Sequence, residues 1–305
     1  MTSISEPSAS ISIVIPTFRR PERLERLLEM VLNQVSALQG SGAVEILVVD
    51  NCPERSAFKA VSTFDDRVRY NSEPVPGVAN ARNRGVNEAL GDYVLFLDDD
   101  ELPRADWLAS FVKQANHGLD ACFGPVEPFY EARPAPDLQN ALDRLFSRRL
   151  PARTGQDISI SRAWLGTGNS MFRKLACFDR PDPFSTDFNS GGEDVWFLRE
   201  LVQNKNIVLT WCAEAIVDEL VPHDRMSKDY VKQRIFKNGQ LRCLIEKGSN
   251  GANGAVRVAF WMSVGVAQFL GYRMASILLL PFKPKVSTNL ELRSAGGLGK
   301  LLWWR

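Results

Sequence analysis

The sequence has few of the residues that mark disulfide frameworks, zinc sites or nucleic-acid binding. Its 305 residues include two histidines and five cysteines, and the cysteines are scattered with no CxxC pair. This pattern disfavours disulfides and structural zinc, favours a reducing compartment and predicts that most of the cysteines are small buried hydrophobes. The formal net charge of +1 lacks the basic surplus of a nucleic-acid binder, so we expect no nucleic-acid partner.

The N-terminus also lacks the features of a secretion signal. Residues 1–10 have neither a basic start nor a long apolar run, and we expect them to be a polar lead-in. No GxGxxG follows the first apolar run, and no GxxxxGK[ST] is present. These absences disfavour a dinucleotide-binding fingerprint and a P-loop.

Strand and helix patterns alternate in the first third of the chain. Apolar runs predict strands, and apolar residues at helical spacing predict helices. The expected order is strand 11–15, helix from 21, strand 44–49, helix 77–90 and strand 93–97. Such alternation is typical of an α/β fold, a mostly parallel sheet with helices on both faces.

The middle of the chain is less periodic. Residues 129–162 are rich in proline and arginine and predict a long loop region with a short helix near 138–146. The glycines within 164–173 indicate close backbone approach to a ligand or to another segment. Further on, the glycine-containing residues 189–192 precede Glu193 and Asp194, which begin a helical pattern.

Carboxylates follow two of the predicted strands. Asp50 ends one apolar run and Asp98, Asp99 and Asp100 end another, so both sets are expected on the same rim of the sheet. Strand alternation would let Asp98 and Asp100 converge while Asp99 points elsewhere. Such carboxylates repel one another unless a cation joins them, and Mg²⁺ or Mn²⁺ suits oxygen ligands. The alternative is a solvated acidic turn that continues into Glu101.

Five segments follow one another along the chain: IVIPTFRR (13–20), EILVVDN (45–51), GVANARNRG (77–85), YVLFLDDD (93–100) and GED (192–194). In this order they resemble motifs of the inverting family 2 glycosyltransferases, in particular the bacterial exopolysaccharide enzymes of the succinoglycan type.

The resemblance implies a Rossmann-like GT-A domain over residues 11–225. Its nucleotide half would cover about 11–126 and its acceptor half about 127–225. Residues 226–305 would form a C-terminal helical region that associates with a membrane.

The resemblance also implies transfer, with inversion, from a nucleoside diphosphate sugar, commonly a UDP sugar. Asp194 would be the catalytic base, with Glu193 as its main rival. A divalent ion, Mn²⁺ or Mg²⁺, would be held by Asp98, Asp100 and His223. The positions that match the family's nucleotide site are Pro16, Thr17, Arg19, Asp50, Arg82, Asp98 and Asp99.

Plain structural roles compete with each of these assignments. Asp50 alone fits a strand-end turn, and Arg82 fits a solvated helix face. Glu193 and Asp194 could be acidic residues that the helix dipole stabilises. His223 could be a surface or structural histidine. A separate point concerns Trp164 and Trp196, for which core packing is favoured over stacking on sugars.

Residues 258–282 are very apolar, with Gln268 and Arg273 as interruptions. About 20 apolar residues can cross a bilayer, although a central arginine is costly there. Basic residues flank the segment, which favours peripheral or monotopic attachment to the cytoplasmic face of the cell membrane. A true span and a soluble helical subdomain stay open.

The function expected from the resemblance is transfer of a sugar to a glycan or lipid-linked acceptor in cell-surface polysaccharide synthesis. A nucleotidyltransferase is one rival, but it would usually need a glycine-rich basic loop where residues 16–20 have no glycine. A non-catalytic scaffold that binds sugar nucleotides is the other, and it would be expected to lose carboxylates that this chain retains.

Overall fold

The computed structural model describes residues 9–38, 43–189, 191–248 and 252–304. The chain forms two compact units. The first contains residues 1–127 and 148–219, and the second contains residues 128–147 and 220–305. Of the lead-in expected at 1–10, residues 1–8 lie outside the described part. The division of residues 11–225 into a nucleotide half, about 11–126, and an acceptor half, about 127–225, stays a prediction.

A mostly parallel sheet is the centre of the first unit. Within the described residues it has seven strands in the order β3-β2-β1-β4-β8-β6-β9. The run from β3 to β4 is parallel, β8 is antiparallel to both of its neighbours, and β6 pairs parallel with β9. The strands are β1 (Ile11–Thr17), β2 (Val44–Asp50), β3 (Arg69–Ser72), β4 (Tyr93–Phe96), β6 (Ala121–Phe123), β8 (Ser170–Arg173) and β9 (Leu209–Trp211).

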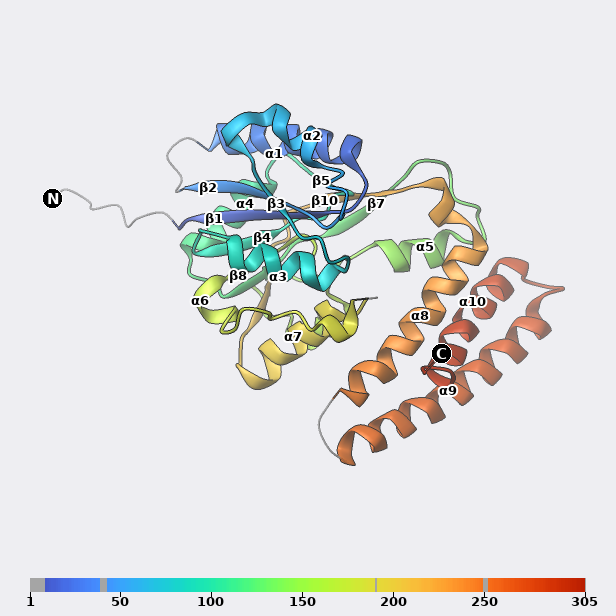
Figure 1. Ribbon diagram of the computed structural model, residues 1–305. Coiled ribbons are helices and arrows are strands. Elements are labelled where there is room, and N and C mark those ends of the chain that lie inside the picture. The colour runs from blue at the N-terminus through green and yellow to red at the C-terminus, as the bar shows by residue number, and fades with distance from the viewer. Residues whose placement is uncertain (1–8, 39–42, 190, 249–251, 305) are drawn as a thin grey trace. The chain divides into compact units, whose positions relative to one another are not determined.

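Helices cover both faces of this sheet, as the α/β pattern predicts. Figure 1 shows α1 and α2 on one face and α3 and α7 on the other. The first helix begins at Pro21, which is favoured at N1, and buries its apolar stripe against the sheet. The helices of the first unit are α1 (Pro21–Ala37), α2 (Phe58–Val61), α3 (Val78–Glu88), α4 (Trp107–Asn116), α6 (Lys174–Cys177) and α7 (Glu193–Asn204), and the short 3₁₀ helices are η1 (Ser62–Arg67), η2 (Ser159–Trp164) and η3 (Thr186–Phe188).

Two strand ends differ from the sequence prediction. The first strand continues through Pro16 to Thr17. Pro16 has no backbone N–H to donate, but β4 pairs with this strand only as far as Val14, so no hydrogen bond to β4 is lost at Pro16. The strand β4 ends at Phe96 rather than at residue 97. The three aspartates after it therefore lie in a turn, where strand alternation does not apply.

The second unit is mainly helical. The short helix expected near 138–146 is α5 (Gln139–Phe146), and the C-terminal region forms α8 (Lys228–Lys247), α9 (Ala252–Leu279) and α10 (Pro284–Leu301). The helix α8 follows the 3₁₀ helix η4 (His223–Met226). Residues Leu142, Val231 and Leu292 are fully buried in the core that joins α5, α8 and α10. Two strands, β7 (Val126–Tyr130) and β10 (Val217–Val221), run across the unit boundaries, and β10 pairs antiparallel with β5 (Glu101–Pro103).

Glycines bring the three long helices of this unit close together. A Cβ atom added at Gly239 of α8 would clash with the carbonyl oxygen of Gly296, and one added at Gly299 would clash with that of Phe236. At Gly297 an added Cβ would lie 2.6 Å from the backbone nitrogen of Phe269 in α9. The helix α10 therefore contacts both α8 and α9 through its backbone, a packing that larger residues would prevent.

Residues 254–279 of α9 form a helix long and apolar enough to cross a membrane, judged by length and composition alone.

Candidate functional site

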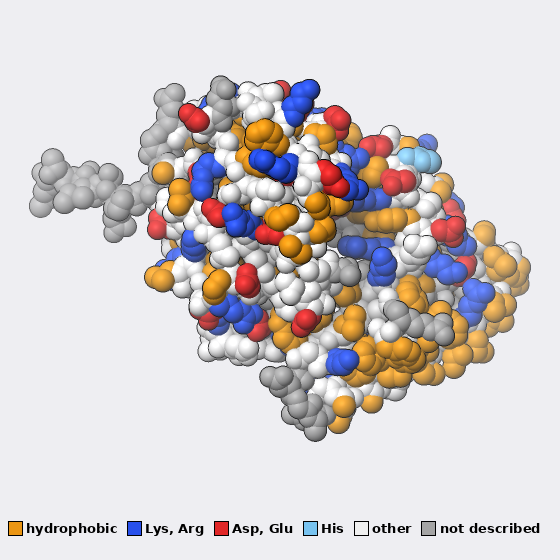
Figure 2. Space-filling model, viewed as in Figure 1, with side chains coloured by type: hydrophobic (Ala, Val, Ile, Leu, Met, Phe, Trp, Pro, Cys, Tyr) orange, Lys and Arg blue, Asp and Glu red, His pale blue; other side chains and the backbone are white. Residues whose placement is uncertain are grey.

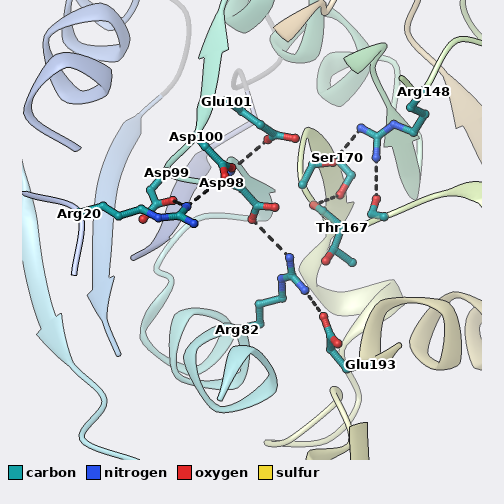
Figure 3. A network of polar contacts seen from close by, with 12 residues as sticks. Arg20, Arg82, Asp98, Asp99, Asp100, Glu101, Arg148, Thr167, Ser170 and Glu193 are labelled. Atoms are coloured by element: carbon teal, nitrogen blue, oxygen red, sulfur yellow. Dashed lines mark hydrogen bonds and ion pairs between the residues drawn. The ribbon is translucent and has the colours of Figure 1, made fainter. Parts of the chain in front are cut away.

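The turn after β1 meets the turn after β4. The hydroxyl of Thr17 donates to Asp99 Oδ2 at 2.8 Å. Arg20 Nη1 donates to Asp99 Oδ1 at 2.6 Å and to Asp100 Oδ2 at 3.0 Å (Figure 3). Burial raises the pKa of Asp99, and the guanidinium of Arg20 opposes that rise. Asp99 and Asp100 thus share one cation, so the prediction that Asp99 points away from its neighbours was wrong.

Arg82 links the aspartate turn to the start of α7. Its guanidinium is almost fully buried and pairs with Asp98 at 3.3 Å and with Glu193 (Figure 3). Burial disfavours the cation, but the carboxylates of Asp98, Glu193 and Asp194 raise the pKa of Arg82 above its ordinary value. The alternative of a solvated helix face is therefore wrong for this arginine.

Glu193 is a buried carboxyl group in this pair. Burial, and after it the charge of nearby Asp194, raise the pKa of Glu193 to about 7, although Arg82 opposes the rise. Among the described residues its Oε2 atom has no hydrogen-bond partner, although it is inaccessible to solvent. A buried oxygen without a hydrogen-bond donor destabilises the fold, and such destabilising features cluster at functional sites.

Asp194 occupies the first turn of α7 beside its neighbour. Gly191 and Gly192 precede it with φ of 120° and 100°, a backbone conformation that side chains rarely adopt, and this confirms the tight loop expected here. Ser190 of the same loop lies outside the described residues. One carboxylate oxygen accepts from Val195 N at 2.7 Å, while the other lies 3.3 Å from the position that a Cβ of Gly166 would take.

A second glycine-containing loop, which includes Gly166 and Gly168, lies against the carboxylates that follow β4 and against that of Asp194. A Cβ atom at Gly168 would lie 2.7 Å from Asp98 Oδ2 and 2.7 Å from Glu101 Oε1. Together with Gly166 beside Asp194, this position confirms that the glycines within 164–173 allow close approach of another segment.

Sequence reasoning missed Arg148 as a residue of this site. Its guanidinium donates to the carbonyl oxygens of Gly124 (3.0 Å), Gly166 (2.8 Å), Gly168 (2.7 Å) and Asn169 (2.9 Å), and it holds the loop in place. Burial lowers the pKa of Arg148, and nearby carboxylates oppose that change. No local signal marks this residue, because it lies in a segment without clear periodicity.

Glu101 was considered only as the continuation of an acidic turn. It is buried, and its Oε2 accepts from the backbone N–H of Asp98 at 3.0 Å. Burial and the charge of Asp98 raise the pKa of Glu101 well above its ordinary range. Its position directly after the aspartate triplet was the available signal.

Several predicted residues lie outside this network. Asp50 is fully buried and accepts from the N–H groups of Cys52 and Ala57 and from the hydroxyl of Tyr70. Arg19, at φ 56°, is exposed and pairs with Glu54 at 3.0 Å.

His223 belongs to the second unit, where its backbone N–H donates to Glu131 at 3.3 Å, and its role as a ligand stays a prediction. Core packing was wrong for Trp164, whose surface is 82% exposed, whereas Trp196 stacks on Phe188. All five cysteines are buried free thiols, as expected.

The residues present fit a divalent cation in charge and in donor type. Among the described residues, the network contains the acidic side chains of Asp98, Asp99, Asp100, Glu101, Glu193 and Asp194 against the guanidinium groups of Arg20, Arg82 and Arg148. Carboxylate oxygens are the donors that Mg²⁺ and Mn²⁺ prefer. In the described part of the chain, no three His, Cys, Asp or Glu side chains are already grouped to hold an ion.

The sheet topology and this acidic site define an α/β enzyme whose ligand site lies beyond the ends of parallel strands. The model of glycosyl transferase family 2 matches residues 12–176. The succinoglycan biosynthesis protein ExoM of Rhizobium meliloti is 30% identical over 259 residues, which are 82% of this chain and 79% of that protein. The chain belongs to glycosyl transferase family 2 and is a glycosyltransferase with a GT-A fold, as predicted.

Other relatives are similar over less of the chain or in fold alone. A GalNAc(5)-diNAcBac-PP-undecaprenol β-1,3-glucosyltransferase of Campylobacter jejuni is 30% identical over 119 residues, 37% of each chain. The mannosyltransferase PcManGT of Pyrobaculum calidifontis, solved with GDP-Man and Mn²⁺, has a TM-score of 0.59 at 17% identity and covers 99% of this chain and 89% of its own. Residues 1–349 of S. aureus TarS, solved with UDP, give a TM-score of 0.54 at 14% identity, with 94% and 89% covered.

Proposed function

We propose that this protein transfers a sugar, with inversion and with the help of a divalent metal, from a nucleoside diphosphate sugar to a glycan or lipid-linked acceptor. The observation that carries the proposal is the bridge that Arg82 makes between Asp98 and Glu193. This bridge brings the carboxylates that follow β4 and the carboxylate that begins α7 into one site. The carboxylates that follow β4 would hold the metal that assists the leaving group. The carboxylates at the start of α7 would lie beside the attacking hydroxyl.

On the donor side, Asp98 and Asp100 are the proposed metal ligands, with His223 as a further candidate. A bound Mn²⁺ or Mg²⁺ would stabilise the negative charge that develops on the departing nucleoside diphosphate. Arg20 pairs with both Asp99 and Asp100 in the structure, and its side chain is 32% exposed, which leaves it able to reach a phosphate group. A guanidinium can bind phosphate oxygens in a forked geometry.

The nucleoside is proposed to lie along the turn after β1 and the end of β2. Pro16, Thr17 and Arg19 belong to the first of these, and Asp50 ends the second. Because Asp50 holds the backbone of Cys52 and Ala57, we assign its main contribution to the position of the loop that follows β2. A direct hydrogen bond from a base such as uracil to its carboxylate stays a prediction.

On the acceptor side, Asp194 is the proposed base. It removes the proton from the acceptor hydroxyl while that oxygen attacks the anomeric carbon, from the face opposite the leaving group. Glu193 cannot easily take this role, because it is buried and paired with Arg82. We assign to Glu193 and Arg82 the positioning of Asp194, and to Arg148 the positioning of the glycine loop beside it.

The setting proposed for this reaction is the cytoplasmic face of the cell membrane, in the synthesis of a surface polysaccharide. Two observations support it. The relative from Rhizobium meliloti is named for succinoglycan biosynthesis, and the one from Campylobacter jejuni is named for an undecaprenol-linked substrate. The apolar helix α9 would place the protein near such a lipid.

A transfer assay tests the proposal. Purified protein is incubated with labelled UDP- and GDP-sugars and a lipid extract, with Mn²⁺ or with a chelator, and the anomeric configuration of the product is read by NMR. The proposal predicts metal-dependent transfer of one donor with inverted configuration. Retained configuration, or equal rates in the chelator, would contradict it.

A further inference from the structure

One side of α9 carries an exposed apolar stripe. Its members recur at helical spacing and continue into the turn before α10, and Figure 2 shows hydrophobic side chains gathered over this helix. Phe260 is 59% exposed, Leu278 68% and Phe282 79%. The exposed residues of the stripe are Val256, Phe260, Val266, Leu270, Met274, Ile277, Leu278, Leu280 and Phe282.

The opposite side of α9 is fixed to α10. Gly265 and Gly297 allow the two backbones to approach closely. Ser276 donates to the carbonyl oxygen of Ser287 at 2.9 Å, and Ser287 donates back to that of Ser276 at 2.8 Å. The two helices therefore behave as one body, with the apolar stripe on its outer side.

The charge pattern of this segment is one-sided. Between Glu246 and Glu291 the sequence contains no acidic residue, whereas it contains the basic residues Lys247, Arg257, Arg273, Lys283 and Lys285. Lys283 and Lys285 follow the apolar turn directly and are exposed. Apolar side chains flanked by cations are the composition that binds the interface of a membrane with anionic lipids.

We propose that α9 lies in the plane of an anionic bilayer, with its stripe inserted among the lipids, and does not cross it. This inference rests on the membrane attachment proposed above and specifies its geometry. A spanning α9 would carry α10, with Glu291, Arg293 and Lys300, into the hydrocarbon. The alternative would be to break the glycine contacts and the paired serine hydrogen bonds. The in-plane position preserves these contacts and covers the stripe.

Vesicle binding tests the occupant of the stripe. Full-length protein should sediment with phosphatidylcholine vesicles that contain phosphatidylglycerol. The double variant Leu270→Glu/Leu278→Glu should lower the partition coefficient at least about tenfold, because burial of two leucines is lost. The matched control Leu175→Glu, which changes a leucine that is 93% exposed in the first unit, should bind as the wild type does.

The basic residues give a second vesicle measurement. Lys283→Gln/Lys285→Gln should weaken binding to the anionic vesicles by roughly fivefold per lysine and leave the weaker binding to pure phosphatidylcholine unchanged. Equal sedimentation of wild type, the leucine variant and the lysine variant would overturn the proposal. The proposal would also be overturned if a second copy of the chain covered the stripe. In that case the wild type would be a dimer in lipid-free buffer, and Leu270→Glu/Leu278→Glu would be a monomer.

Cysteine labelling separates the in-plane position from a span. Ala255→Cys and Lys283→Cys place exposed thiols near the two ends of α9, and the five native cysteines are buried. In sealed inverted membrane vesicles, a membrane-impermeant maleimide should label both variants from outside. Labelling of one variant alone would show a span. Nucleotide-induced thermal stabilisation, measured in every variant, tells failure of this inference apart from failure of the proposed donor site.

Discussion

The first unit holds a buried network of charged side chains, whereas in the second unit glycines let the backbones of neighbouring helices approach closely. Arg82 bridges Asp98 and Glu193 in the first, and Gly296 and Gly299 bring helices together in the second. The charged network holds carboxylates near one another at a cost in stability, which is typical of functional sites. The glycines let α8, α9 and α10 pack closely, and one apolar face of α9 stays exposed. Under the proposals above, the first unit carries the catalytic carboxylates and the second unit carries the membrane attachment.

The largest expected effect is on catalysis. Asp194→Asn should lower the rate of transfer by roughly a hundred- to ten-thousand-fold, because a general base is removed while the shape is kept. Binding of the nucleotide with Mn²⁺ should be retained. The matched control is Asp187→Asn, which changes an exposed aspartate in the preceding turn and should leave the rate unchanged. A normal rate in Asp194→Asn would remove this residue from its role.

The next effect distinguishes buried from exposed charge. Arg82→Met should reduce the free energy of unfolding by about 3–5 kcal/mol, because Glu193 and Asp98 would lose their buried partner. Arg84→Met, two residues away, breaks a surface pair with Glu88 and should cost less than about 1 kcal/mol. Urea denaturation of both variants measures the difference. Equal losses would mean that the network in the first unit does not depend on Arg82.

A smaller effect is expected in the second unit. Gly299→Ala should destabilise the protein by about 1–3 kcal/mol, because the new methyl group meets the backbone of Phe236. Gly271→Ala in α9 is the control: no atom lies within 4 Å of its added Cβ, and alanine favours the helix. Thermal unfolding should therefore shift down for the first variant and not for the second. The comparison fails if both behave alike.

An effect of similar size appears only when the pH is changed. The folded pKa of Glu193, about 7, lies above its ordinary value of 4.5, so the folded state holds a proton that the unfolded state releases. The stabilisation from this proton is complete below about pH 4.5 and is lost as the pH rises through about 7. Between about pH 5 and about pH 8, this group should lower the free energy of unfolding of the wild type by on the order of 1–3 kcal/mol. Glu193→Gln, which has no carboxyl group to titrate, should not show that decrease.

An identical pH dependence in Glu193→Gln and the wild type would show that the buried carboxyl group does not titrate in this range.

The sequence predicted the sheet more fully than it predicted the site. Continuous apolar runs such as 44–49 and 93–97 are local signals, and they became β2 and β4 to within one residue. The contacts of the site are not local: Arg82 and Glu193 are 111 positions apart, and Thr17 and Asp99 are 82 apart. Their residue types pointed to function, but their pairing follows from the strand order, which no single segment encodes.

The C-terminal helices show a different limit. Residues 226–305 were expected to be helical as one region, although the three glycines of α10 disfavour an isolated helix over residues 284–301. Close packing against α8 and α9 overrides that preference. Trp164 shows the opposite case, because an aromatic side chain usually seeks a core, yet here it stands exposed.

The most direct test of the donor site is a thermal-shift measurement with UDP, GDP, CDP and ADP, each with and without Mn²⁺. A ligand that binds the folded state raises the unfolding temperature with its concentration. We expect one nucleotide to stabilise the wild type only when Mn²⁺ is present, and Asp100→Ala to abolish that stabilisation. No shift with any nucleotide, or an equal shift in Asp100→Ala, would contradict the assignment of the aspartate turn as the site for metal and nucleotide.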